Sequence, residues 1–211
     1  MADAGSEPAE EYSLLRREIR AIREPFRLLA ATLRLRRAPT GSQAVMVLPG
    51  FSTNDRIMIP LRCYLRSHGH TVWGWDLGVN RGEVDTNLAR VVAQVERRVA
   101  ENSGRPIVMV GWSLGGVFAR EVARTRPELV EQLVTLASPA RSYSRAAGDP
   151  VGDRIDTPIT AFYSKRDGVV SWKGVIDELN PNVEMIEVNS SHLGVTLDAT
   201  AWLKIAELLA D

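Results

Sequence analysis

The sequence predicts an α/β protein: a mostly parallel six-stranded sheet with helices on both of its faces. From about residue 44, short apolar runs rich in β-branched residues alternate with longer segments of helical spacing. Gly, Pro, Asp and Asn stand at most of the junctions between them, as turn residues do. Strands that alternate with helices build a parallel sheet covered on both faces, and ligands gather at the carboxyl ends of its strands.

The six predicted strands are short, apolar and bounded by turn residues. In chain order they are AVMVLP (44–49), TVWGW (71–75), PIVMVG (106–111), VEQLVTLA (130–137), PITAFY (158–163) and VEMIEV (183–188). The predicted helices between and after them carry apolar residues at intervals of three and four. They span about 56–67, 86–102, 114–125, 172–179 and 197–210.

Residues 1–40 are predicted to form an arginine-rich, amphipathic helical segment that precedes a single domain over residues 41–211. Six apolar residues of this segment recur at the spacing of one helical stripe. They are Leu15, Ile19, Ile22, Phe26, Leu29 and Leu33. Pro25 is expected to kink or divide the helix. Either the stripe packs on the sheet with the arginines in solvent, or the segment attaches to a partner or an anionic membrane surface.

Composition excludes several classes of function. The chain has 211 residues with zero formal net charge, so it has no general attraction to nucleic acid, and no nucleic-acid partner is expected. The single cysteine, Cys63, excludes an internal disulfide and a multi-cysteine metal site, and neither a metal nor a cofactor is predicted. The acidic N-terminus is unlike a signal peptide, and no apolar run has the length of a membrane span, which together predict a cytoplasmic location.

The stretch VMVGWSLGG (109–117) places Ser113 between glycines, after a predicted strand and at the start of a predicted helix. A nucleophilic serine on a strained strand-to-helix turn needs small neighbours, as Gly111 and Gly115 are. The helix that follows directs its first N–H groups and its positive end toward a developing oxyanion. The pattern indicates a nucleophile; the alternative is a polar residue in a tight turn.

A serine nucleophile needs a base further along the chain, and the sequence contains three histidines. His192 follows the last predicted strand, where a loop can carry the imidazole back over the edge of the sheet. His68 and His70 lie in a helix-to-strand turn upstream of the serine and are interpreted as ordinary turn residues. The order of serine, acid and histidine therefore favours His192 as the base.

The acid that orients the base is expected between the serine and the histidine. Asp167 lies in a turn directly after the strand predicted at 158–163. Three other aspartates lie in the loop before that strand and would need a longer reach. They are Asp149, Asp153 and Asp156.

Two backbone N–H groups are candidates for an oxyanion hole. One belongs to Leu114, directly after the serine, and the other to Phe51 in the loop that follows the first strand. Gly50 allows this loop to approach a substrate carbonyl closely. The same loop could be only a strand-ending turn in which Asn54 or Asp55 caps the next helix, and capping and donation would use different residues.

With these residues, the sequence from about 44 to 210 resembles the α/β-hydrolase superfamily. It looks most like small bacterial esterases and lipases, and bacterial relatives of the lipase-like GPI inositol-deacylases. The resemblance implies a hydrolase fold that lacks the first two strands, with the arginine-rich helix in their place. The connection from about 138 to 157 is too short for a large cap domain. Pro49 stands where many relatives have histidine in the oxyanion loop, and Trp112 where many lipases have histidine before the nucleophile.

The function predicted from these residues is cleavage of carboxylic esters, either small molecules or lipids, through an acyl-enzyme. Ser113 would attack, His192 would accept its proton, Asp167 would hold the imidazole, and the amides of Phe51 and Leu114 would bind the oxyanion. Thioester hydrolysis and acyl transfer could use the same residues. A non-catalytic scaffold that binds a partner or a membrane surface is a further alternative.

Overall fold

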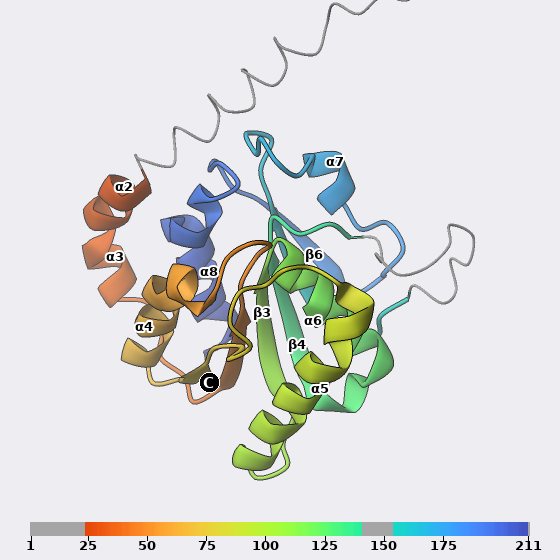
Figure 1. The fold of residues 1–211 in the computed structure, drawn as a ribbon. Coiled ribbons are helices and arrows are strands. Elements are labelled where there is room, and N and C mark those ends of the chain that lie inside the picture. The colour runs from red at the N-terminus through yellow and green to blue at the C-terminus, as the bar shows by residue number, and fades with distance from the viewer. Residues whose placement is uncertain (1–23, 141–153, 211) are drawn as a thin grey trace, which may run out of the picture.

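Six parallel strands form the central sheet of the computed structural model, which describes residues 24–140 and 154–210 (Figure 1). The strand order is β2-β1-β3-β4-β5-β6, and every neighbouring pair is parallel. The strands are β1 (Ala44–Leu48), β2 (Thr71–Trp73), β3 (Ile107–Trp112), β4 (Val130–Leu136), β5 (Ile159–Tyr163) and β6 (Val183–Glu187). The predicted α/β class is confirmed, and each strand overlaps the segment predicted for it.

Helices cover both faces of the sheet because successive residues of a strand point to opposite sides. In β1, Val45 and Val47 belong to one apolar cluster, whereas Met46 and Leu48 belong to another. The main helices of the domain are η2 (Asp55–Met58), α4 (Ile59–Ser67), α5 (Val84–Glu101), α6 (Leu114–Thr125), α7 (Trp172–Val175) and α8 (Ala199–Leu208). Helices α4 and α8 cover the first cluster, and α5 and α6, in front of the sheet in Figure 1, cover the second.

Nearly all of α6 is buried, because it packs against β3, β4 and α5. Even Arg120 is enclosed there, and its Nη1 lies 2.6 Å from Oδ2 of Asp177, whose side chain is equally buried. Burial lowers the pKa of the Arg120 guanidinium, and the neighbouring Asp177 carboxylate opposes that shift. This ion pair fixes the segment after α7 against the centre of the domain.

The same carboxylate explains why α7 is shorter than the sequence predicts. A helix over 172–179 was expected, but α7 ends at Val175. Asp177 Oδ1 accepts hydrogen bonds from the backbone N–H groups of Leu179 and Asn180, each at 3.2 Å, so the chain turns there. The predicted C-terminal end of this helix is therefore wrong, because the hydrogen bonds that the Asp177 side chain accepts compete with the hydrogen bonds of a helix.

The N-terminal part begins, as described, with α2 (Glu24–Ala30) and α3 (Thr32–Arg36), which are separated at Ala31. Of the predicted apolar stripe, Phe26, Leu29 and Leu33 are exposed, so the interpretation that these residues pack on the sheet is wrong. Leu28 and Leu35 pack toward the domain instead. The remaining stripe residues lie outside the described part of the chain; they are Leu15, Ile19 and Ile22.

The loops at the carboxyl ends of the strands differ from those at the amino ends. At the amino ends, the short exposed turn 102–105 joins α5 to β3. At the carboxyl ends lie the loops that follow β1, β3, β5 and β6 (Figure 1). In the described parts of the chain, none of the helices is both long and apolar enough to cross a membrane.

Candidate active site

Ser113 lies in the turn between β3 and α6, with φ 52° and ψ −122°. A positive φ is costly for a non-glycine residue and persists only where the surroundings enforce it. Here the two elements touch: a Cβ on Gly111 would lie 2.4 Å from Cα of Gly116, and one on Gly115 would lie 2.4 Å from the carbonyl oxygen of Leu48. Glycine at these positions is therefore required for helix and strand to pack so closely.

His192 lies in the loop after β6, with its Nε2 3.0 Å from the hydroxyl oxygen of Ser113. The loop is held in place by the residue that precedes the serine. The indole Nε1–H of Trp112 donates to the carbonyl oxygen of His192 at 3.0 Å, and the two rings lie 5.4 Å apart between centroids. Trp112, where many lipases have histidine, thus connects the turn that carries Ser113 directly to the histidine loop.

Asp167 lies after β5, and its Oδ2 is 2.8 Å from Nδ1 of His192. Its other oxygen, Oδ1, accepts hydrogen bonds from the backbone N–H groups of Val169 and Val170, both at 2.8 Å. The carboxylate is almost fully buried, so few water molecules compete for it. These contacts fix the carboxylate and orient the imidazole.

The three side chains therefore form one chain of hydrogen bonds. When Nδ1–H of His192 donates to Asp167, Nε2 is left to accept the proton of the Ser113 hydroxyl. Of the other aspartates considered from the sequence, Asp156 is exposed and pairs with Arg154, and Asp149 and Asp153 lie outside the described residues.

A second contact ties the acid loop to the histidine loop. Ser164 Oγ donates to the carbonyl oxygen of Ser190 at 2.6 Å and accepts from the backbone N–H of Arg166 at 3.0 Å. Ser190 Oγ in turn donates to Asp198, which caps α8. Sequence reasoning did not single out these serines, since nothing in their local pattern distinguishes them from ordinary loop residues.

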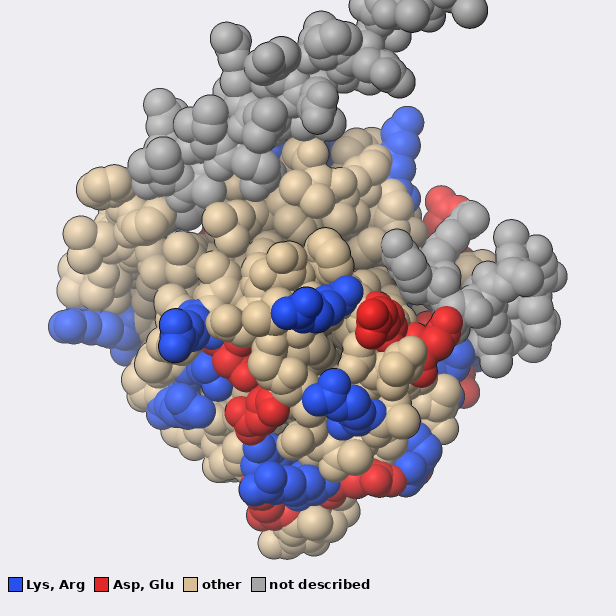
Figure 2. Space-filling view, viewed as in Figure 1, with Lys and Arg blue, Asp and Glu red and all other residues tan. Residues whose placement is uncertain are grey.

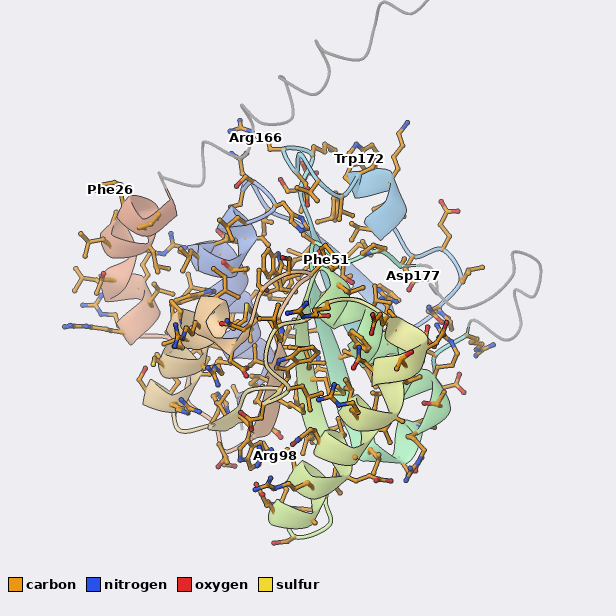
Figure 3. All side chains as sticks on the ribbon, viewed as in Figure 1. Phe26, Phe51, Arg98, Arg166, Trp172 and Asp177 are labelled. Carbon is orange, nitrogen blue, oxygen red and sulfur yellow. The ribbon has the colours of Figure 1, made fainter. Side chains whose placement is uncertain are left out.

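The loop after β1 passes directly over the serine. A Cβ on Gly50 would lie 2.9 Å from the Trp112 ring and 3.2 Å from Cβ of Ser113, so only glycine allows this approach. Phe51 follows, with its side chain 61% exposed at the carboxyl end of the strands (Figure 3). Leu114 is the first residue of α6, a position whose N–H has no acceptor within the helix. Of the two residues predicted to supply oxyanion donors, Leu114 thus directly follows Ser113, and Phe51 directly follows the glycine that approaches Ser113.

Asn80 holds this loop, although no sequence motif indicated such a role. Its amide Nδ2 donates to the carbonyl oxygen of Pro49 at 2.8 Å. Its backbone pairs on both sides, because Ser52 N–H donates to its carbonyl at 2.6 Å and its own N–H donates to Thr53 O at 2.7 Å. Asn80 is completely buried. No local signal could reveal it, because the contacts join segments about thirty residues apart.

The loop also caps the helix that follows it. Asn54 Oδ1 accepts from the backbone N–H of Arg56 at 3.0 Å at the start of η2. Asp55 instead accepts from the backbone N–H groups of Trp75 and Asp76, which joins this loop to the end of β2. Capping and the approach to Ser113 therefore use different residues, in agreement with the expectation from the sequence.

The two remaining histidines lie away from Ser113, and both are buried. Nδ1 of His68 lies 2.9 Å from the carbonyl oxygen of Tyr64, and its Nε2 lies 2.9 Å from that of Leu35, so this ring joins α4 to α3. Within the described residues, no group of three or more His, Cys, Asp or Glu side chains is arranged to bind a metal ion.

Comparison with known proteins adds a family and a fold. The model of the alpha/beta hydrolase family matches residues 44–202. A pimeloyl-[acyl-carrier protein] methyl ester esterase of Aliivibrio salmonicida is 33% identical over 107 residues, or 48% of this chain and 38% of the relative. The protein of the same name from Salmonella heidelberg is 35% identical over 100 residues, 46% and 38% of the two chains. The matched part of this chain thus spans well under half the length of these relatives.

Solved structures agree in fold at low sequence identity. An alpha/beta hydrolase enzyme from the metagenome of lagoon sediments of Mar Chica, Morocco, superposes with a TM-score of 0.61 at 16% identity, over 81% of this chain and 90% of the other. The monoacylglycerol lipase of Paleococcus ferrophilus gives 0.61 at 15% identity, over 81% and 96%. These likenesses concern the arrangement of strands and helices.

Proposed function

Because the chain belongs to the alpha/beta hydrolase family, we propose that it is a serine hydrolase that cleaves carboxylic esters. The observation that carries the proposal is the chain of hydrogen bonds from Ser113 through His192 to Asp167. The named relatives that act on a methyl ester agree with an ester substrate. The substrate class is a small-molecule or lipid ester.

In the first half of the reaction, Ser113 Oγ attacks the acyl carbon while Nε2 of His192 takes the hydroxyl proton. The carbonyl π bond opens, and the N–H groups of Phe51 and Leu114 stabilise the resulting oxyanion. The carbonyl then re-forms, the bond to the alkoxy group breaks, and the imidazolium returns the proton to the leaving alcohol. Asp167 stabilises the imidazolium and keeps its Nδ1–H directed away from the serine.

In the second half, water replaces the alcohol. His192 accepts a proton from a water molecule while the water oxygen attacks the acyl carbon of the acyl-enzyme. The same two N–H groups bind the second oxyanion. The bond between the acyl carbon and Ser113 Oγ breaks, and the serine regains its proton from the imidazolium. The products are a carboxylic acid and an alcohol, and every step uses only groups of this chain and water.

The proposal is tested by labelling and by kinetics. A fluorophosphonate probe should modify Ser113, identified by mass spectrometry of the labelled peptide. Ser113→Ala should lower kcat for a p-nitrophenyl ester by about 10⁴–10⁶. The matched control is Ser103→Ala, in an exposed turn at the amino ends of the strands. This variant should keep both labelling and turnover.

Two outcomes would count against the assignment. If Ser113→Ala hydrolyses the ester as fast as the parent protein, Ser113 is not the nucleophile. If a thioester is cleaved, or an acyl group is transferred to added glycerol, much faster than an ester is hydrolysed, the assigned residues remain the same. The reaction is then thioester cleavage or acyl transfer. Product analysis by chromatography distinguishes these cases.

A further inference from the structure

The outer face of α2 and α3, defined here as Phe26, Leu29 and Leu33, is strongly exposed. These side chains are 70%, 72% and 69% exposed. Phe26 and Leu29 lie three residues apart on α2, which places them on one side of that helix, and Leu33 lies on α3 beyond the break at Ala31. Figure 3 shows Phe26 at the outer end of α2, directed away from the domain. Three large apolar side chains so exposed on adjacent helical turns are typical of a surface that binds something.

The inner side of the same helices borders the domain across an apolar groove of about 350 Å³. Leu28 and Leu35 line this groove together with Tyr64 of α4 and Trp202 of α8, and Leu29 and Arg36 border it as well. His68 adds the hydrogen-bond contact to Leu35 O described above. The two helices are therefore attached to the domain on this side, and Phe26 and Leu33 lie outside the lining of the groove.

Positive charge accompanies this face. The sequence from residue 24 to 37 contains four arginines and one glutamate. Arg34, Arg36 and Arg37 are exposed, and in the described part of the chain no carboxylate forms an ion pair with them. Apolar side chains that can enter the acyl region, next to arginines that can reach phosphate groups, are complementary to an anionic lipid surface.

The helix that carries part of this face lies near the histidine loop of the candidate active site. Helix α2 packs against η4 (Gly194–Leu197), which begins two residues after His192. The loops around Ser113 expose apolar side chains of their own, with Phe51 at 61% and Val169 at 64%. In Figure 2 the charged side chains gather over the lower half of the visible surface, and the upper half between the grey parts is mostly uncharged. A lipid surface in contact with α2 would therefore lie close to the opening of the site.

From these observations we propose that the outer face of α2 and α3 docks the protein on an anionic lipid surface. Phe26, Leu29 and Leu33 enter the boundary between headgroups and acyl chains, and the three arginines bind lipid phosphates. This interaction goes beyond the proposed ester hydrolysis and does not depend on it, because the residues involved are separate from Ser113, His192 and Asp167.

The test is co-sedimentation of the full chain with vesicles of phosphatidylcholine alone and of phosphatidylcholine mixed with phosphatidylglycerol. The protein should pellet with the mixed vesicles and much less with the neutral ones. Replacing Arg34, Arg36 and Arg37 by glutamine should weaken binding about fivefold for each arginine at the surface. The triple variant of Phe26, Leu29 and Leu33 to serine should lose binding to both kinds of vesicle.

Matched controls replace similar residues elsewhere. Arg90, Arg97 and Arg105 are exposed on or after α5, and their glutamine variants should bind vesicles as the parent does. Ser113→Ala should also bind unchanged, and the serine variants of the outer face should keep turnover of a short, water-soluble ester. Failure of docking and failure of the proposed reaction are thereby separated.

Three results would overturn the proposal. The parent protein could partition equally into neutral and anionic vesicles, or into neither. The control arginine variant could lose as much binding as the variant of Arg34, Arg36 and Arg37. Light scattering could show a dimer that the serine variant of the outer face separates into monomers, in which case this face binds a second copy of the chain.

Discussion

Replacement of Asn80 by alanine tests whether the loop after β1 sets the rate of the proposed reaction. The change removes the bond from Nδ2 to Pro49 O and the bond that Oδ1 accepts from the N–H of Gly82. A hydrogen bond contributes about 1 kcal/mol net, and a buried carbonyl left without a donor costs about 1–3 kcal/mol. We therefore expect a loss of about 2–4 kcal/mol in the free energy of unfolding, measured by urea denaturation.

The kinetic consequence follows from what the loop carries. Phe51 lies two residues after Pro49, so a loop released at Pro49 is expected to displace the proposed oxyanion donor, the N–H of Phe51. Removal of one oxyanion donor lowers kcat by about 10²–10³ in enzymes of this mechanism. We expect a fall of about 10² in kcat for a short p-nitrophenyl ester, with a smaller change in KM, under conditions where the variant is folded.

The control for this variant is Asn87→Ala. Asn87 is also an asparagine whose amide donates to a backbone carbonyl, that of Gly82 at 3.0 Å, but its hydrogen bonds join it to Gly82, Glu83 and Arg90 and not to the loop after β1. It should lose some stability and keep kcat. If Asn80→Ala is destabilised as calculated yet turns over as fast as the parent, the position of this loop does not control the oxyanion donor, and the reasoning is refuted.

Two further predictions concern substrate length and stability. Phe51→Ala keeps the backbone donor and should mainly change acyl-length preference, tested with esters from acetate to palmitate; an equal loss at every length would show that the loop was misinterpreted. Burial, followed by the charge of Glu207, raises the pKa of Tyr64 from 10.0 to about 12. Its neutral form is therefore favoured in the folded state, so this contribution to stability is complete below pH 10.0 and lost as the pH rises through about 12. Tyr64→Phe should remove this loss of stability, as measured by urea unfolding across this pH range. If the free energy of unfolding of the variant falls with pH as steeply as that of the parent, the prediction is wrong.

Much of the fold is predictable from the sequence because the strands are buried on both sides. Continuous apolar runs such as 44–48 and 107–112 have few other stable arrangements than the centre of a parallel sheet. Chain order then limits the choice of Asp167 and His192, since both follow strands whose carboxyl ends lie at one edge. The resemblance to the α/β-hydrolase superfamily is confirmed by the family match over residues 44–202.

Features that depend on contacts between distant segments could not be predicted. Asn80 and Ser164 lie in stretches that read as ordinary loops, and their partners are far away in sequence. The apolar stripe on α2 and α3 has the spacing of a packed helix, but the contact with the domain comes from Leu28, one position before Leu29, and Leu35, two positions after Leu33. Periodicity indicates that a helix has an apolar side and leaves open what that side meets.

The amino and carboxyl ends of the strands lie on opposite sides of the domain, which has a practical consequence for attaching the protein to a support. A tag or carrier inserted in the exposed turn 102–105 would sit at the amino ends of the strands, at the far side of the domain from the serine. An immobilised preparation made this way would keep its opening turned outward, toward substrate in solution.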